Sequence, residues 1–169
     1  TTAKICLIED SELPLSRTFE IDRAHRFMKG SGMPIKVPVV EMVEIGAGGG
    51  SLASVDKLKR VLVGPLSSAA DPGPACYGRG GTKPAVTDAN LILGRIDAKK
   101  FAGGEIQLDK LAASASIKKY IATPLAHDLA QSANAIIEIV EENMANAARV
   151  HAIEGGKDIT ERTLIGFGG

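Results

Sequence analysis

The chain has 169 residues, of which 44% are hydrophobic and 24% are charged, with 20 Lys and Arg against 20 Asp and Glu. This composition is typical of a globular domain, and the balanced charge removes the usual electrostatic argument for a nucleic-acid or anionic-membrane partner. No apolar stretch approaches the roughly 20 residues that span a bilayer, and the N-terminus lacks the layout of a signal peptide, so we expect a cytoplasmic protein.

The cysteines and the chain ends add two expectations. Cys6 and Cys76 lie far apart and form no CxxC or His/Cys cluster, which argues against a disulfide framework or a structural zinc site. The sequence begins with Thr1 instead of Met and stops on Gly168-Gly169. We therefore interpret it as part of a longer polypeptide.

The first third of the chain has the pattern of β-strands. Three apolar runs with short links, residues 4–9, 15–21 and 35–43, suggest an antiparallel meander. Two further runs, 52–55 and 60–63, are separated by Asp56-Lys57-Leu58-Lys59 and predict a hairpin.

Residues 64–87 are rich in Pro and Gly, which excludes a regular helix or an interior strand. The segment could be a linker, but a long irregular loop that carries Cys, Tyr and Arg is more typical of an ordered, site-forming loop. Its Cys76 has no His adjacent in sequence, so we expect a buried packing residue more than a nucleophile.

The remainder of the chain has helical periodicity. Thr87 is a candidate N-cap, and Asp109 can cap a helix that runs to about Ile121. Residues 127–151 repeat apolar positions every three or four residues, as an amphipathic helix does, and 164–167 resemble a final buried strand.

These patterns predict an α/β or α+β class. We expect a single fragment over residues 1–169, with mainly strands over 1–63, a Pro/Gly loop over 64–87 and mainly helices over 88–169.

The glycine-rich run Glu44-Ile-Gly-Ala-Gly-Gly-Gly-Ser51 follows a predicted strand. Successive backbone N–H groups without Cβ atoms can line a concave site for an anion, and glycine permits the positive φ that such sites use, so the run favours phosphate binding. It is not the dinucleotide fingerprint, because Ser51 occupies the third glycine position, and no Gly-Lys-Ser/Thr makes it a P-loop. The alternative is a glycine-rich bend between two strands.

Three carboxylates could serve such a site. Asp71 and Asp88 flank the Pro/Gly loop and Glu44 opens the glycine run, and magnesium at a nucleotide prefers hard oxygen ligands of this kind. Asp88 could equally be a first-turn acid at the positive end of its helix, and Asp71 a turn residue.

Three segments in this order and spacing closely resemble the hydantoinase A / 5-oxoprolinase family, and a Phe-Gly-Gly close adds to the likeness. They are Glu44 to Ser51, Asp71-Pro-Gly-Pro-Ala-Cys-Tyr-Gly-Arg-Gly-Gly81 and Thr87-Asp-Ala-Asn-Leu-Ile-Leu-Gly-Arg95. The resemblance covers essentially all of the chain but only an internal portion of much longer family members.

The resemblance implies a fold like that of the actin, hexokinase and heat-shock ATPase group, in which two ribonuclease-H-like domains hold ATP between them. This chain would supply much of the second domain, an incomplete mixed sheet with helices. The implied activity is ATP-dependent opening of a cyclic amide, a hydantoin or 5-oxoproline, by phosphorylation of the amide oxygen, with a divalent metal such as Mg²⁺.

The implied partners are the small cyclic-amide substrate, the remainder of the same chain and a hydantoinase B-type subunit, with neither nucleic acid nor membrane among them. Two alternatives stay open: the nucleotide-binding subunit of an ATP-dependent ketone carboxylase, and a non-catalytic interaction module. In either enzyme we expect the isolated chain to be inactive.

The same resemblance implies roles for individual residues. Those expected near the phosphates are Thr1, Thr2, Gly46, Gly48, Gly49 and Ser51. Gly168 and Gly169 are expected near the nucleoside, Asp88 and Asp71 as catalytic candidates, and Glu44 and Asp88 as metal candidates.

Overall fold

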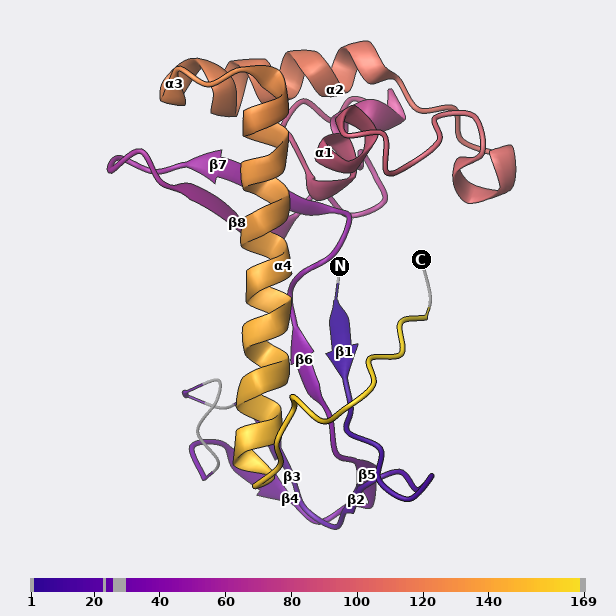
Figure 1. Cartoon of the computed structure of the whole chain (residues 1–169), viewed down its shortest axis with the longest axis vertical. Coiled ribbons are helices and arrows are strands. Elements are labelled where there is room, and N and C mark those ends of the chain that lie inside the picture. The colour runs from indigo at the N-terminus through magenta and orange to yellow at the C-terminus, as the bar shows by residue number, and fades with distance from the viewer. Residues whose placement is uncertain (1, 23, 26–29, 168–169) are drawn as a thin grey trace. The chain divides into compact units, whose positions relative to one another are not determined.

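A computed structural model describes residues 2–22, 24–25 and 30–167 (Figure 1). The chain divides into two compact units, one made of Thr1–Ala3 and Ile45–Met144 and the other of Lys4–Glu44 and Ala145–Gly169. The α/β class is confirmed, but the sheets are small: each sheet in the described part of the chain has two strands.

The first six strands pair in nested couples, so the predicted meander is wrong. The couples are β1 (Ala3–Ile5) with β6 (Val43–Ile45), β2 (Leu15–Ser16) with β5 (Val39–Val40), and β3 (Phe19–Ile21) with β4 (Met33–Ile35). Only β3 and β4 are consecutive, and they pair antiparallel with Phe19 opposite Ile35. The chain therefore runs outward and returns alongside itself, instead of reversing after every strand.

Glu9 connects the first strands to the C-terminal segment within the same unit. Its carboxylate accepts ion-pair contacts from Lys157 at 2.8 Å and Arg162 at 2.7 Å. These two cations hold the pKa of Glu9 below its usual range. Beyond them, residues 164–167 form no strand among the described residues, and Leu164 and Phe167 are almost fully exposed, so the predicted buried strand is wrong.

The predicted hairpin in the other unit is confirmed. Strands β7 (Ser51–Val55) and β8 (Val61–Ser67) pair antiparallel, with Ala53 opposite Val63 and an irregularity between Ser51 and Ala53. The turn is closed by Asp56, whose carboxylate accepts from the backbone N–H of Leu58 and of Arg60.

The predicted Pro/Gly loop over 64–87 is shorter in the structure, because β8 continues to Ser67 and the first α-helix begins at Val86. The remaining loop, residues 68–85, is partly buried. It contains the short helix η1 (Ala75–Tyr77), which precedes α1 (Val86–Ile92), and a bridge pairs Ala85 with Leu52 of β7. The loop therefore packs back on the hairpin.

Asp88 is the residue that holds this loop to α1. Its side chain is completely buried, and its oxygens accept from the backbone N–H groups of Ala75 (3.2 Å), Cys76 (2.7 Å) and Ala85 (2.8 Å). The N-cap of α1 is Ala85, so the predicted cap at Thr87 is wrong. The helix begins earlier because Asp88, at its third position, accepts from the N–H of Ala85, as the acidic residue of a capping box does.

The remaining helices follow the predicted pattern. Asp109 caps α2 (Lys110–Ile117) by accepting from Leu111 and Ala112 N–H. The helical path continues beyond the predicted end, through a π-helical turn, and then reaches the long amphipathic helix. The segments after α2 are η3 (Lys118–Ala122), α3 (Thr123–Leu125) and α4 (Leu129–Glu154), and the short helix η2 (Phe101–Gly104) lies before α2.

The apolar stripe predicted for the long helix is buried in α4, at Ala133, Ile136, Ile137, Val140 and Ala147. None of the helices in the described part of the chain is long and apolar enough to cross a membrane.

Replacing Asp88 tests how much of this unit depends on it. Asp88→Asn keeps the size of the side chain but puts an amide donor against backbone N–H groups, so buried donors lose their charged acceptor. We expect a loss of about 3 kcal/mol in the free energy of unfolding, measured by urea denaturation. The matched control is Asp97→Asn, because Asp97 is exposed and accepts from one backbone N–H, that of Lys99. Equal stability of the two variants would contradict the assignment.

The two cysteines should differ in reactivity. Burial and then the Asp88 carboxylate raise the pKa of the fully buried Cys76 thiol far above its usual range. Burial also raises the pKa of Cys6, but that side chain is only partly buried. Because the thiolate is the reactive form, iodoacetamide at mildly alkaline pH should label Cys6 first, as read by peptide mass spectrometry. Cys76 should be labelled only after denaturation; rapid labelling of Cys76 in the folded protein would refute the packing role.

Candidate functional site

The glycine run forms a tight bend between β6 and β7. The N–H of Ser51 donates to the Gly48 carbonyl at 3.0 Å, and the N–H of Gly48 donates to Ser51 Oγ at 3.1 Å. Ser51 is almost fully buried beneath the bend. The bend is therefore closed on itself by its last residue, in both main chain and side chain.

Two consecutive carbonyls of the bend are each held by a residue from outside it. The Gly49 carbonyl accepts from Thr87 N–H at 2.8 Å and from Thr87 Oγ1 at 2.9 Å. The Gly50 carbonyl accepts from Ser68 N–H at 2.8 Å and from Ser68 Oγ at 3.1 Å. Ser68 directly follows β8, and Thr87 lies in the first turn of α1. The Pro/Gly loop between them is therefore hydrogen-bonded to the bend at its beginning and just beyond its end.

Three backbone donors of the bend have no acceptor in the part of the chain that the structure describes: the N–H groups of Gly46, Gly49 and Gly50. Gly46 and Gly49 are exposed and Gly50 is partly buried. Unpaired amides gathered in one turn can bind anionic oxygens. This geometry fits the phosphate-binding interpretation of the sequence.

The bend needs glycine for a reason other than the one predicted. None of its glycines has φ in the left-handed region, so the expected requirement for positive φ is wrong. A Cβ on Gly49 would instead lie 2.7 Å from Thr87 Oγ1, closer than real Cβ contacts allow. Close approach of the Thr87 hydroxyl to the main chain is what excludes a side chain there.

The three predicted carboxylates have different surroundings. Asp88 has no exposed surface and accepts three backbone N–H groups, which favours the structural alternative of a first-turn acid. Asp71 is exposed in a turn, and Glu44 is exposed and pairs with Lys4 at 2.9 Å. The described residues contain no group of three His, Cys, Asp or Glu side chains that could hold a metal ion. The catalytic and metal roles of these carboxylates stay predictions.

The other predicted contacts are placed only in part. Thr2 is exposed just before β1, whereas Thr1, Gly168 and Gly169 lie outside the described residues. Sequence reasoning missed Ser68 and Thr87 as partners of the bend. Thr87 has a recognisable signal, a hydroxyl at a helix start, but that signal predicts a cap; Ser68 has none.

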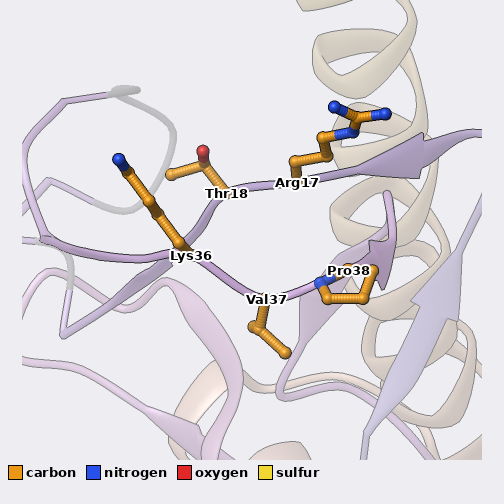
Figure 2. A pocket seen from close by; sticks show the side chains of 5 residues that line it. All are labelled: Arg17, Thr18, Lys36, Val37 and Pro38. Atoms are coloured by element: carbon orange, nitrogen blue, oxygen red, sulfur yellow. The ribbon is translucent and has the colours of Figure 1, made fainter.

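A separate hollow lies in the unit that contains Lys4–Glu44 (Figure 2). It is lined by Arg17, Thr18, Lys36, Val37 and Pro38. Figure 2 shows the Arg17 and Lys36 side chains extending from neighbouring stretches of chain, with Thr18 between them. Its lining is cationic and apolar and includes no carboxylate, so it offers no acid–base pair.

Comparison with known proteins gives a consistent set of relatives. Over 135 residues the chain is 44% identical to caprolactamase subunit alpha of Pseudomonas jessenii, covering 80% of this chain and 19% of the relative. It is 40% identical over 136 residues to the acetophenone carboxylase gamma subunit of Aromatoleum aromaticum, again covering 80% of this chain and 19% of the relative.

Solved structures agree in fold. The crystal structure of ATP-dependent caprolactamase from Pseudomonas jessenii matches 77% of this chain and 19% of that one, with a TM-score of 0.67 and 40% identity. Nucleotide-free acetone carboxylase matches 93% of this chain and 21% of that one, with a TM-score of 0.80 and 23% identity, which supports the fold alone.

The chain spans about a fifth of the length of these relatives. The family model for hydantoinase/oxoprolinase matches residues 1–169. The resemblance carried by the three sequence segments is thereby confirmed, and the chain belongs to the hydantoinase/oxoprolinase family.

Proposed function

We propose that this chain is part of the nucleotide-binding region of an ATP-dependent enzyme that opens a cyclic amide. The observation that carries the proposal is the bend at Gly46–Ser51, where three main-chain amides lack acceptors among the described residues. The caprolactamase of Pseudomonas jessenii, which is 40% identical to the matched part of this chain, is an ATP-dependent enzyme. A lactam is a cyclic amide, so the relative and the proposed reaction share one bond type.

The chemistry explains why ATP would be needed. An amide carbonyl is a poor electrophile, and water attacks it slowly. Transfer of the γ-phosphoryl group forms a bond from the amide oxygen to phosphorus and breaks the bond to the β-phosphate oxygen, so ADP leaves. A first water then adds to the activated carbon and the ring C–N bond breaks, with a proton passing to the ring nitrogen, which leaves an acyl phosphate. A second water releases inorganic phosphate from this acyl phosphate and leaves the free carboxylate, so two waters are consumed in all. The protein's main contribution to such a transfer is positioning and charge stabilisation.

The bend residues suit this contribution. Backbone N–H groups fixed before the reaction can donate to phosphate oxygens as negative charge redistributes among them, without any rearrangement cost at that moment. We propose that Gly46, Gly49 and Gly50 supply these donors, while Gly48 and Ser51 close the turn that gathers them. A divalent cation, which the family resemblance implies, would bind phosphate oxygens and offset their charge.

Partner subunits belong to the same proposal. The caprolactamase and acetophenone carboxylase relatives are both named as subunits. We propose that the full-length protein acts together with a second subunit of the hydantoinase B type.

Blocking the bend should abolish activity. Gly49→Val in the full-length protein with its partner subunit would place Cβ 2.7 Å from Thr87 Oγ1, and the displaced bend would lose its donor geometry. We expect amide-dependent ADP release to fall by at least roughly 100-fold, as the loss of fixed donors to transition-state charge does in other enzymes. Gly155→Val is the matched control, because Gly155 is exposed just after α4 and the nearest atom to a Cβ there would lie at an ordinary contact distance of 3.4 Å. Full activity of Gly49→Val would refute the phosphate role of the bend.

A ketone carboxylase is the second candidate, favoured by the 40% identity to the acetophenone carboxylase gamma subunit. The two reactions differ in the acceptor of the phosphoryl group, since carboxylation consumes bicarbonate and ring opening does not. We expect ATP turnover by the full-length enzyme to depend on a cyclic amide and to be unchanged by bicarbonate. Turnover that requires bicarbonate and a ketone would instead identify a carboxylase, and absence of ATP binding by calorimetry would indicate a non-catalytic interaction module.

A further inference from the structure

We infer that Ser68 and Thr87 are positioning residues that set the direction of the amides in the glycine bend. The inference rests on the proposed function, because it assigns these two hydroxyls a part in nucleotide binding. Neither residue needs to touch the nucleotide. Each acts through a carbonyl of the bend that it holds.

The bonds to the two carbonyls have the same form. Thr87 donates both its N–H (2.8 Å) and its Oγ1 hydroxyl (2.9 Å) to the Gly49 carbonyl, and Ser68 donates both its N–H (2.8 Å) and its Oγ hydroxyl (3.1 Å) to the Gly50 carbonyl. A carbonyl oxygen has two lone pairs, so each of these acceptors is fully occupied. Two neighbouring peptide groups of the bend are thus each held by two donors.

In a planar trans peptide group, a carbonyl held in one direction also sets the direction of the N–H in the same group. In a trans peptide the C=O and the N–H of the same group point in opposite directions. The Gly49 carbonyl shares its peptide group with the N–H of Gly50, so when Thr87 holds the one, the other is directed away from Thr87. That N–H has no acceptor among the described residues.

The bonds from Ser68 to the Gly50 carbonyl orient the Gly49 amide indirectly, through the hydrogen bond that Ser51 makes. The Gly50 carbonyl shares its peptide group with the N–H of Ser51, and this N–H donates to the Gly48 carbonyl at 3.0 Å. The Gly48 carbonyl in turn shares its peptide group with the N–H of Gly49, the second donor without an acceptor in the described chain. Ser68 therefore orients the Gly49 amide through the turn that Ser51 closes.

These hydroxyls matter because glycine peptides have little intrinsic preference for one orientation. A bend rich in glycine gains close approach to a ligand but loses the restriction that side chains would impose. The paired hydrogen bonds from Ser68 and from Thr87 restore that restriction. Removing one hydroxyl leaves the backbone N–H donor in place, so the fold is retained while the peptide group gains freedom.

The test uses Thr87→Val and Ser68→Ala in the full-length enzyme with its partner subunit. Loss of one hydrogen bond of this kind should raise KM and Kd for ATP about 5-fold in each variant. We expect KM for the cyclic amide to change by less than about 2-fold, because the loss acts on the amides that face the nucleotide. Thr87→Ser restores the hydroxyl and should return KM for ATP to the wild-type value.

Matched controls remove hydroxyls of the same types elsewhere in the unit. Thr82 is exposed in the Pro/Gly loop and Ser54 is exposed on β7, so Thr82→Val and Ser54→Ala should leave KM for ATP unchanged. Thermal unfolding is measured for all variants. If Thr87→Val does not fold, Ser68→Ala carries the test alone, since Ser68 is only partly buried.

The outcomes separate the inference from the proposed function. If KM for ATP is unchanged in both variants while Gly49→Val abolishes ADP release, the positioning role is overturned and the phosphate role of the bend stands. Equal increases in KM for ATP and for the amide, or failure of Thr87→Ser to restore the ATP value, would show a merely structural role and also overturn the inference. If Gly49→Val itself retains activity, the proposed function fails.

Discussion

The buried carboxylate of Asp88 is the constraint on which the candidate site depends. An ionised carboxylate without solvent is costly unless several donors surround it, and here three backbone N–H groups do so. Those donors come from the start of α1 and from the middle of the Pro/Gly loop, which the carboxylate therefore joins. The next residue toward the N-terminus, Thr87, is thereby held in the first helical turn, where its hydroxyl and N–H reach the Gly49 carbonyl. One charged side chain thus organises a loop, a helix start and, through its neighbour, the bend.

This arrangement explains why the three sequence segments that carry the family resemblance belong together. The bend at 44–51, the loop at 71–81 and the helix start at 87–95 are distant in sequence but joined by the bonds of Asp88 and Thr87. Close contact also limits side chains within the segments: a Cβ on Gly81 would collide with the Gly73 carbonyl oxygen, as one on Gly49 would with Thr87. Several residues of these motifs therefore serve packing and hydrogen bonding, and only part of the bend presents groups to a ligand.

The parts of the fold that local sequence decides were predictable. The β7–β8 hairpin, the Asp109 cap and the apolar stripe of α4 depend on neighbours within a few residues, and all three are confirmed. The nested strand pairing and the start of α1 were not, because they depend on contacts between segments far apart in the chain. The strand expected at 164–167 is absent for a related reason. Apolar residues favour burial, but their pattern does not say which surface covers them, and Leu164 and Phe167 are almost fully exposed in the described chain.

The sequence indicated which amides the candidate site could use, but not the residues that hold the bend. A run of glycine after a strand signals available amides, and the structure places three such amides in one bend. We propose that Ser68 and Thr87 decide which way the Gly49 and Gly50 amides point, and their residue types are common in loops and at helix starts. Glycine leaves the peptide groups free to rotate, so a glycine-rich motif supplies the N–H donors of an anion site but does not fix their orientation. Their orientation also requires donors that hold the carbonyls of the motif, and in this chain those donors are Ser68 and Thr87, on either side of the Pro/Gly loop.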